Sequence, residues 1–211
     1  MRHISKSPVE PDFFSSWKAK ANADWQPDFD EMDSKIKRNL KVFLIKEQLG
    51  LCCYCEAKIT EKDSHIEHFR PQTKYQDRAL DYNNLLCSCQ NNLKKGEPRH
   101  CGNAKDDWFD EKLTISPLNP DCSEHFRYTG DGHIYPRDNA DAAAKETIEH
   151  LKLDIPLLVE NRRSVLDTFL DDSITDEEFK DFYHKYFDKL SCQNPPEFIS
   201  AVNDVFSQKN K

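Results

Sequence analysis

Six cysteines between residues 52 and 101 constrain the fold of this chain more than any other feature. Cys52 and Cys55 are separated by two residues, a spacing that lets one tight turn direct two thiolates at the same ion. The others of this stretch are Cys53, Cys87, Cys89 and Cys101. Clustered cysteines in a chain without a signal peptide favour metal binding over disulfides. We therefore predict a structural Zn²⁺ site that holds this stretch together.

The third and fourth zinc ligands follow less directly from the spacing. A compact zinc finger ends in a second two-residue gap, whereas Cys87 and Cys89 are separated by one residue. We choose Cys89 with Cys101 and interpret residues 90–100 as a polar, basic insertion, so that Cys87 points away from the metal. Cys87 and His100 are the alternatives. The predicted zinc ligands are Cys52, Cys55, Cys89 and Cys101.

A carboxylate stands next to an imidazole between the two groups of cysteines, as Glu67-His68. Hydrolysis of a phosphodiester needs a base that deprotonates water and a cation that neutralises phosphate charge. A histidine with an ordinary pKa near about 6.5 suits the base, and a carboxylate suits Mg²⁺ or Mn²⁺. We predict that His68 is the general base and that Glu67 binds the catalytic ion. An ordinary surface histidine is the alternative, and His65 is a second candidate base.

Two asparagines complete the predicted site. Asn84 precedes two leucines, where it can brace the loop between two strands and thereby orient His68; an ordinary turn asparagine is the alternative. Asn103 follows Cys101 at the start of a predicted helix. There its amide oxygen can complete the metal site opposite Glu67. We therefore include Asn84 and Asn103 among the predicted catalytic residues.

Taken in this order, the cysteines, the Glu-His pair and the asparagine resemble an HNH nuclease, a ββα-metal fold held by a zinc site. More specifically, the chain resembles the PtuB-type HNH endonucleases of Septu bacterial anti-phage defence systems, some of which accompany a retron reverse transcriptase. Outside the finger, the resemblance is carried by residues 116–122 (Ser-Pro-Leu-Asn-Pro-Asp-Cys), residues 126–134 and Arg162-Arg163.

The resemblance also bears on where the motif ends. Residues 100–105, His-Cys-Gly-x-x-Lys, are similar to the second cysteine cluster of this family and favour Cys101 as a ligand. The family often has histidine at the position of Asn103, and asparagine keeps an oxygen ligand while losing the imidazole. Asn92 is the alternative end, because residues 92–96 are similar to the Asn-x-x-Lys-Gly ending of many HNH motifs. If Asn92 ends the motif, there is no insertion.

The resemblance implies a toxic effector nuclease that hydrolyses phosphodiester bonds in DNA or RNA, with transfer RNA among the candidate substrates. It implies a PtuA-like ATPase as the partner that holds and regulates the nuclease, and in a retron system a reverse transcriptase with its RNA–DNA hybrid. The implied cofactors are a structural Zn²⁺ and a catalytic Mg²⁺ or Mn²⁺. A non-catalytic zinc-finger adaptor that scaffolds a defence complex is the alternative, and it would have no use for Glu67-His68.

We expect a mostly helical α+β fold in three regions that form one compact unit. These are an N-terminal arm and helix (1–50), the ββα-metal nuclease core (51–137) and a C-terminal helical, partner-docking region (138–211). Apolar residues three and four positions apart predict a helix over 28–49, ended by Gly50. Strands are predicted at 57–59 and 65–68, paired as a hairpin, with a further strand at 85–88 and a helix at about 102–109.

Charge restricts the class of protein further. The formal net charge is −8, and residues 139–211 carry fifteen acidic against nine basic residues, a net of −6. This acidic tail suits docking on a basic partner, although a merely solvated helical face is the alternative. The chain has no run of about 18 apolar residues and no signal peptide at its start, so we expect a cytoplasmic protein without a membrane span.

Overall fold

The computed structural model describes residues 1–169, 175–188 and 195–207. In this part of the chain, helices dominate and the sheets are short, which makes the protein α+β. The helices are α1 (Asp12–Lys18), α2 (Ser34–Glu47), α3 (Gly102–Lys105), α4 (Ala142–His150), α5 (Pro156–Asp167), α6 (Asp176–Asp188) and α7 (Ile199–Phe206). Three short 3-10 helices are η1 (Gln76–Arg78), η2 (Tyr82–Asn84) and η3 (Cys122–His125). The strands are β1 (Ser64–His68), β2 (Leu85–Cys89), β3 (Phe126–Tyr128) and β4 (Ile134–Pro136).

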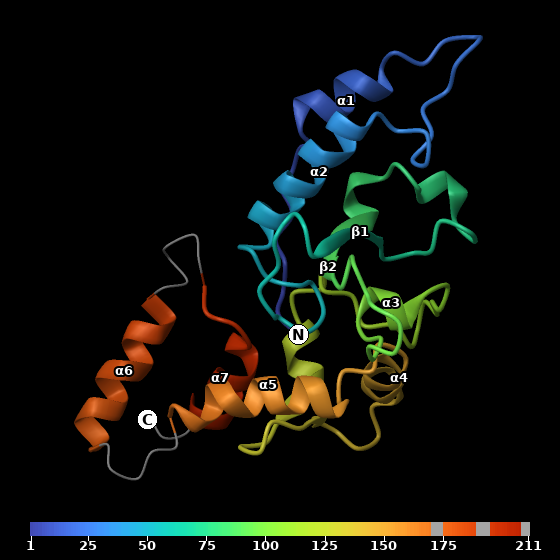
Figure 1. Cartoon of the computed structure of the whole chain (residues 1–211). Helices are drawn as coiled ribbons and strands as arrows, with labels where there is room; N and C mark the ends of the chain where they lie inside the picture. Colours follow the sequence, from blue (N-terminus) through green and yellow to red (C-terminus); the bar gives the residue numbers. More distant parts are fainter. Residues whose placement is uncertain (170–174, 189–194, 208–211) are drawn as a thin grey trace.

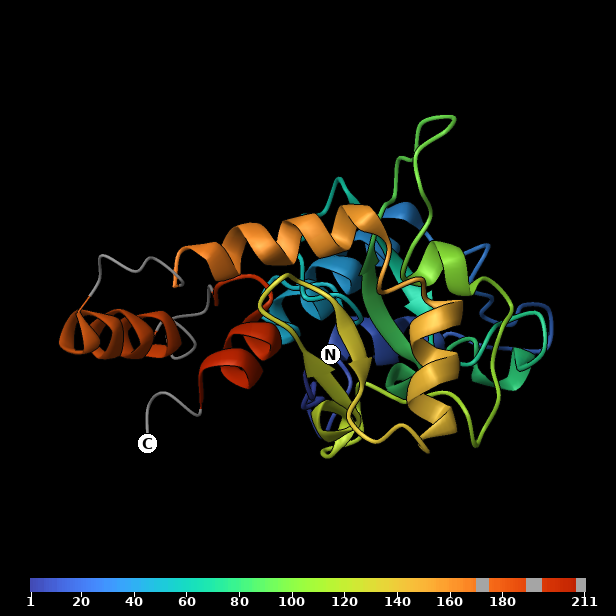
Figure 2. The same cartoon turned by 90° about the horizontal axis from the view of Figure 1, so that it is seen from below.

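The elements group around two antiparallel strand pairs, β1–β2 and β3–β4. α1 packs on α2, and α2 packs on β2, so the N-terminal helices cover one side of the first pair (Figure 1). α4 packs on β4 and α7 on β3, and α5 contacts α7 (Figure 2). Residues 90–100 project from the body as the expected loop between β2 and α3 (Figure 2). Across the described ranges, none of the helices combines the length and apolar character that crossing a membrane requires.

Helix α2 begins later than the predicted helix over 28–49. The carboxylate of Asp33 accepts hydrogen bonds from the backbone nitrogens of Lys35 (2.9 Å) and Ile36 (3.3 Å), and this cap fixes the start of the helix. At the other end Gly50 has a left-handed backbone (φ 76°), as expected for a residue that ends a helix. The chain therefore passes from α2 directly into the turn that holds Cys52.

The predicted pairing of residues 57–59 with residues 65–68 is wrong. β1 pairs with β2, so that Glu67 lies opposite Leu86 and His68 opposite Leu85. Every residue of β2 is buried, and pairing with this apolar strand removes more surface from water than a local hairpin would. Lys58 instead forms an isolated bridge with Leu51, which closes the turn between Cys52 and Cys55. The predicted helix at 102–109 is also shorter, since α3 ends at Lys105.

Two clusters of buried side chains stabilise the described chain. The first runs in sequence from Met1 to Leu158, and the second includes Leu166, Phe169 and Phe206 from the end of the chain. The change from one cluster to the other falls inside α5. Residues 138–158 thus pack with the first cluster. The division of the chain into the regions 1–50, 51–137 and 138–211 stays a prediction.

The turn between β3 and β4 fits tightly against α5. Gly132 in this turn has φ 92°, and a β-carbon there would collide with the carbonyl oxygen of Val159 and lie 2.9 Å from the backbone nitrogen of Arg163. The buried side chain of Arg162 donates to the carbonyls of Gly132 (2.6 Å) and Leu153 (2.9 Å). These bonds satisfy the guanidinium, whose pKa is lowered by burial.

We expect Gly132→Ala to lower the free energy of unfolding by about 2–4 kcal/mol, because the substitution adds both backbone strain and a collision with α5. Gly96 is the matched control: it has φ 93° but open space around its β-carbon position. Gly96→Ala should cost about 1 kcal/mol, from strain alone. Urea unfolding of the two variants checks the difference, and equal losses would contradict the tight fit of this turn.

Candidate metal centre and active site

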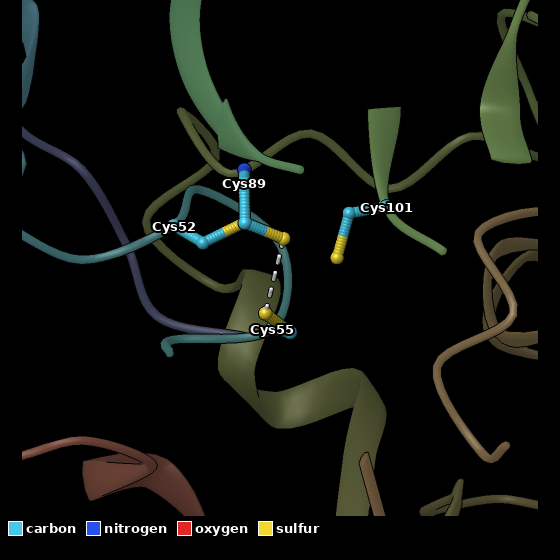
Figure 3. A group of neighbouring side chains, drawn as sticks. All are labelled: Cys52, Cys55, Cys89 and Cys101. Atoms are coloured by element: carbon cyan, nitrogen blue, oxygen red, sulfur yellow. Dashed lines mark hydrogen bonds between the residues drawn. The ribbon is translucent and has the colours of Figure 1, made fainter. Parts of the chain in front are cut away.

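Four cysteine side chains from three separate segments converge on one point (Figure 3). Cys52 and Cys55 come from the turn after α2, Cys89 ends β2, and Cys101 precedes α3. Their sulfur atoms all lie within 4.8 Å of one another, and all four residues are buried. Sγ of Cys55 is 3.9 Å from Sγ of Cys89, close to the edge of about 3.8 Å of a tetrahedron of thiolates about 2.3 Å from Zn²⁺. The group therefore fits a tetrahedral zinc site.

The surroundings of Cys52 favour its thiolate form. Its Sγ accepts a hydrogen bond from the backbone nitrogen of Cys89 (3.4 Å) and lies 3.7 Å from Oγ of Ser88. Burial raises the pKa of the Cys52 thiol, but hydrogen bonds from neighbouring thiols, the largest from Cys101, outweigh burial and hold the pKa well below its usual value. A thiolate is the form that binds metal.

The two alternative ligands lie outside the group of four. Sγ of Cys87 faces the carbonyl of Lys41 (3.6 Å), and burial raises the pKa of Cys87 to about 12, so its thiol is protonated. Nδ1 of His100 lies 3.2 Å from Sγ of Cys101 and 3.6 Å from Sγ of Cys89. His100 therefore borders the cysteine group rather than replacing one of its members. The geometry agrees with the predicted choice of Cys89 and Cys101.

Glu67 lies on β1 with a buried carboxylate that has three polar neighbours. Its Oε1 accepts a hydrogen bond from the Tyr54 hydroxyl (3.0 Å) and pairs with Nζ of Lys105 (3.0 Å). Its Oε2 lies 3.4 Å from Nε2 of His65. Burial raises the pKa of Glu67, but the hydrogen bond from His65 and the charge of Lys105 outweigh burial and hold the pKa below its usual value. The side chain is thus an ionised carboxylate in a buried position.

Gly102 lets the backbone at the start of α3 approach this carboxylate closely. A β-carbon at Gly102 would collide with Oε2 of Glu67 and lie 2.7 Å from Nε2 of His65. His65 and Glu67 are two residues apart on β1 and so project from the same face. Two ligands about 2.1 Å from one ion lie about 3.0–3.4 Å apart, which matches the 3.4 Å between these two atoms. The pair could therefore hold a divalent ion, a role in which the sequence analysis, which considered His65 only as an alternative base, did not include it.

The His68 side chain has contacts of its own at the end of β1. Its Nε2 lies 3.0 Å from the carbonyl of Ala79, which can only accept, so Nε2 carries the proton and Nδ1 is the basic nitrogen. The ring of Phe29 packs edge-on against the imidazole, with ring centroids 4.3 Å apart. Burial lowers the pKa of His68. The imidazole is therefore neutral near pH 7 and able to accept a proton.

Lys105 contacts both Glu67 and His68. Its buried ammonium donates to the carbonyl of His68 (3.0 Å) as well as pairing with Glu67. It thereby fixes the backbone at His68 and the carboxylate of Glu67 relative to each other. The sequence contains a signal for this residue, because Lys105 ends the cysteine segment 100–105.

Asn84 has the contacts expected of a brace. Its Oδ1 accepts from the backbone nitrogen of Arg70 (2.7 Å), and its Nδ2 donates to the carbonyls of Arg70 and Arg78 (3.0 Å each). The loop held in this way contains Ala79, whose carbonyl holds His68. An effect of Asn84 on His68 stays a prediction.

The structure does not bring Asn103 together with Glu67. The side-chain nitrogen of Asn103 donates to the carbonyl of Gln90 (2.5 Å). The competing Asn92 donates to the carbonyl of Lys62 (2.9 Å), in the loop before β1. Neither asparagine is placed by these bonds at the Glu67 carboxylate, so a metal-binding role for Asn103 stays a prediction.

Two relatives resemble this chain in sequence. The protein described as "Retron Vc95 putative HNH endonuclease" of Vibrio cholerae serotype O1 biovar El Tor is 29% identical over 142 residues, which cover 64% of this chain and 67% of the relative. The Septu protein PtuB of Bacillus thuringiensis is 35% identical over 63 residues, 28% of this chain and 24% of the relative. The chain is thus similar to a putative HNH endonuclease of a retron and to a Septu protein. The predicted resemblance is thus confirmed. No protein-family profile matches the chain.

Proposed function

We propose that this protein is a metal-dependent HNH endonuclease that hydrolyses phosphodiester bonds, with His68 as general base and with Glu67 and His65 as ligands of the catalytic ion. The observation that carries the proposal is the arrangement on β1. An ionised carboxylate and a neutral imidazole occupy neighbouring positions, and the buried ammonium of Lys105 contacts both residues. The HNH name of the Vibrio relative supports the same assignment.

In this proposal β1, β2 and α3 form the ββα-metal finger, and Zn²⁺ is held by the four cysteines. The zinc site joins the turn before β1 to the end of β2 and the start of α3. It thereby fixes β1 relative to Gly102, which lies so close to the side chains of Glu67 and His65 that a β-carbon would not fit there. Rigid placement of this kind is what orienting a water molecule against phosphorus requires.

His68 takes the proton from the attacking water through Nδ1. The hydrogen bond from Nε2 to the Ala79 carbonyl holds the ring and stabilises the positive charge that the imidazole acquires. Glu67 is not the base, because its oxygens are already engaged by Tyr54, His65 and Lys105. Glu67 and His65 would hold Mg²⁺ or Mn²⁺, and the chemistry that this ion supplies is neutralisation of charge on the phosphate.

We further propose that the nuclease acts in the cytoplasm as the effector of a defence system. The names of the two relatives place them with retron and Septu components. A PtuA-like ATPase is the proposed partner, joined in a retron system by a reverse transcriptase with its RNA–DNA hybrid. DNA and RNA, including transfer RNA, are the candidate substrates. A non-catalytic adaptor would not need a buried Glu67 held by Lys105.

The metal site can be tested apart from cleavage. We expect His65→Ala and Glu67→Gln each to weaken Mn²⁺ binding by at least about tenfold, measured by electron paramagnetic resonance on the zinc-loaded full chain. Glu67→Gln also leaves the buried ammonium of Lys105 without its carboxylate, so His65→Ala is the cleaner variant. Glu160→Gln, at an exposed position of α5, is the matched control. Wild-type Mn²⁺ affinity in His65→Ala would remove His65 from the site.

A further inference from the structure

A groove with a volume of about 430 Å³ lies between α2 and the segments around β1. Three cations of α2 line one wall, Lys37, Arg38 and Lys41, and the other wall includes Glu61, His65 and Asn91. We call this the α2 groove. Because His65 lines the groove and lies 3.4 Å from Glu67, the groove borders the proposed metal site.

The charge of the α2 groove is opposite to that of the whole chain. The chain has a formal net charge of −8, whereas the named lining residues include three permanent cations against the single carboxylate of Glu61. α3, the helix nearest the proposed site, offers no comparable surface: its lysine, Lys105, is buried and paired with Glu67. A polyanion that approaches His65 therefore finds its positive charges on α2.

Lys37 and Lys41 are held in place by contacts within the protein but can still bind an anion. Nζ of Lys41 donates to the carbonyl of Ser64 (3.0 Å), which leaves two of its three N–H donors. Nζ of Lys37 lies 4.3 Å from the centre of the Phe29 ring, and that ring packs against His68. Lys37 and Lys41 are one helical turn apart, about 6 Å along the axis, so they face successive positions of an extended chain.

The ion pair between Arg38 and Glu61 is exposed, with an N–O distance of 2.6 Å and side-chain exposures of 67% and 36%. Exposed pairs of this kind contribute about 0–1 kcal/mol, so a phosphate can displace the carboxylate. Glu61 thus competes with the ligand of the groove, and its removal should strengthen binding. A groove with a merely structural role would show no such gain.

We infer that the α2 groove binds the sugar-phosphate backbone of a nucleic-acid strand and leads it to His65 and Glu67. The inference rests on the proposed function, because it takes the phosphodiester substrate from there. The new element is the surface that holds the strand. Its cations lie on α2, outside the β1–β2–α3 segment.

Binding of fluorescein-labelled DNA duplex, single-stranded DNA and RNA of one sequence tests the inference. The zinc-loaded full chain is used without added Mg²⁺ or Mn²⁺, so that binding is measured without cleavage. We expect Lys37→Ala and Lys41→Ala each to weaken binding of the preferred probe about 3- to 10-fold and to reduce the salt dependence by about one ion. Glu61→Gln should strengthen binding about two- to fivefold.

Lys35 and Lys46 supply matched controls, since both are exposed on α2 and neither lines the groove. Lys35→Ala and Lys46→Ala should bind as the wild type does. Equal effects of the control and groove substitutions, or no binding of any probe by the wild type, would overturn the inference.

If the wild type cleaves nucleic acid but the groove variants keep its affinity and salt dependence, only the groove assignment fails. If the wild type binds through the groove but never cleaves with Mg²⁺ or Mn²⁺, the proposed function fails instead.

Discussion

Serine in place of Cys52 or Cys101 should leave a chain that neither retains zinc nor folds. The sulfur atoms of four buried cysteines meet within 4.8 Å, and a structural zinc site of this kind contributes about 10–16 kcal/mol of binding free energy. The total stability of a domain is about 5–15 kcal/mol, so loss of the ion removes most or all of it. Zinc content measured by mass spectrometry and folding measured by circular dichroism check this expectation.

Cys87→Ala is the matched control for the zinc prediction. Cys87 is as deeply buried as the ligands, but its thiol faces the carbonyl of Lys41 and burial raises its pKa to about 12. The variant should retain one zinc ion per chain and lose only a modest part of the stability. A Cys52→Ser protein that is folded and active without zinc would show that the ion is not structural.

His68→Ala should reduce nucleic-acid cleavage by at least about 10²–10⁴-fold, the range for loss of a general base. The fold, zinc content and Mn²⁺ binding should stay as in the wild type, since the His68 imidazole is held by Ala79 and Phe29 and is not one of the proposed metal ligands. His184→Ala, at an exposed position of α6, is the control and should cleave normally. Wild-type cleavage by His68→Ala would show that His68 is not the general base.

The pH dependence follows from the burial of His68. Burial lowers the pKa of the imidazole from its ordinary value of about 6.5, so the neutral form persists to lower pH than in an exposed histidine. Cleavage should therefore be fully developed at pH 7 and fall as the pH drops below 6.5, through the lowered pKa. A rate that keeps rising well above pH 7 would indicate a different base.

The grouping of Cys52, Cys55, Cys89 and Cys101 could be predicted because zinc chemistry restricts the spacing of its ligands strongly. A two-residue gap fixes Cys52 and Cys55 to one turn, and the tetrahedral need of zinc left few choices for the remaining two. The choice of Cys101 required a loop of residues 90–100, and the structure contains this loop. The Glu67-His68 pair was recognisable for the same reason, since both are groups that phosphodiester hydrolysis needs.

The contacts between distant segments could not be read from the sequence. A strand period shows that His65 and Glu67 share a face, but the close approach of Gly102 depends on how α3 packs against β1. Pairing of β1 with β2 rather than with residues 57–59 depends on the buried surface of the whole core. Asn103 looked suited to the metal because it follows Cys101, yet its side chain bonds to Gln90.

The C-terminal region contacts the cysteine segment directly. Glu56, next to Cys55, accepts hydrogen bonds from the backbone nitrogens of Phe198 (3.2 Å, to its carbonyl) and Ser200 (2.9 Å, to its carboxylate). The backbone nitrogen of Cys101 donates to the carbonyl of Leu151 (2.8 Å). Deleting residues 138–211 would therefore disturb the zinc site, and partner docking by this region is better tested with exposed acidic residues replaced singly.

Cleavage by the purified full chain is the most direct test of the proposed nuclease. Wild-type and His68→Ala proteins, each zinc-loaded and each with its PtuA-like partner, would be incubated with plasmid DNA, single-stranded DNA and transfer RNA, with and without Mg²⁺ or Mn²⁺. We predict that the wild type cleaves at least one of these substrates only when the divalent ion is added, and that His68→Ala does not. Equal cleavage by the two proteins, or no cleavage of any substrate by the wild type, would contradict the assignment.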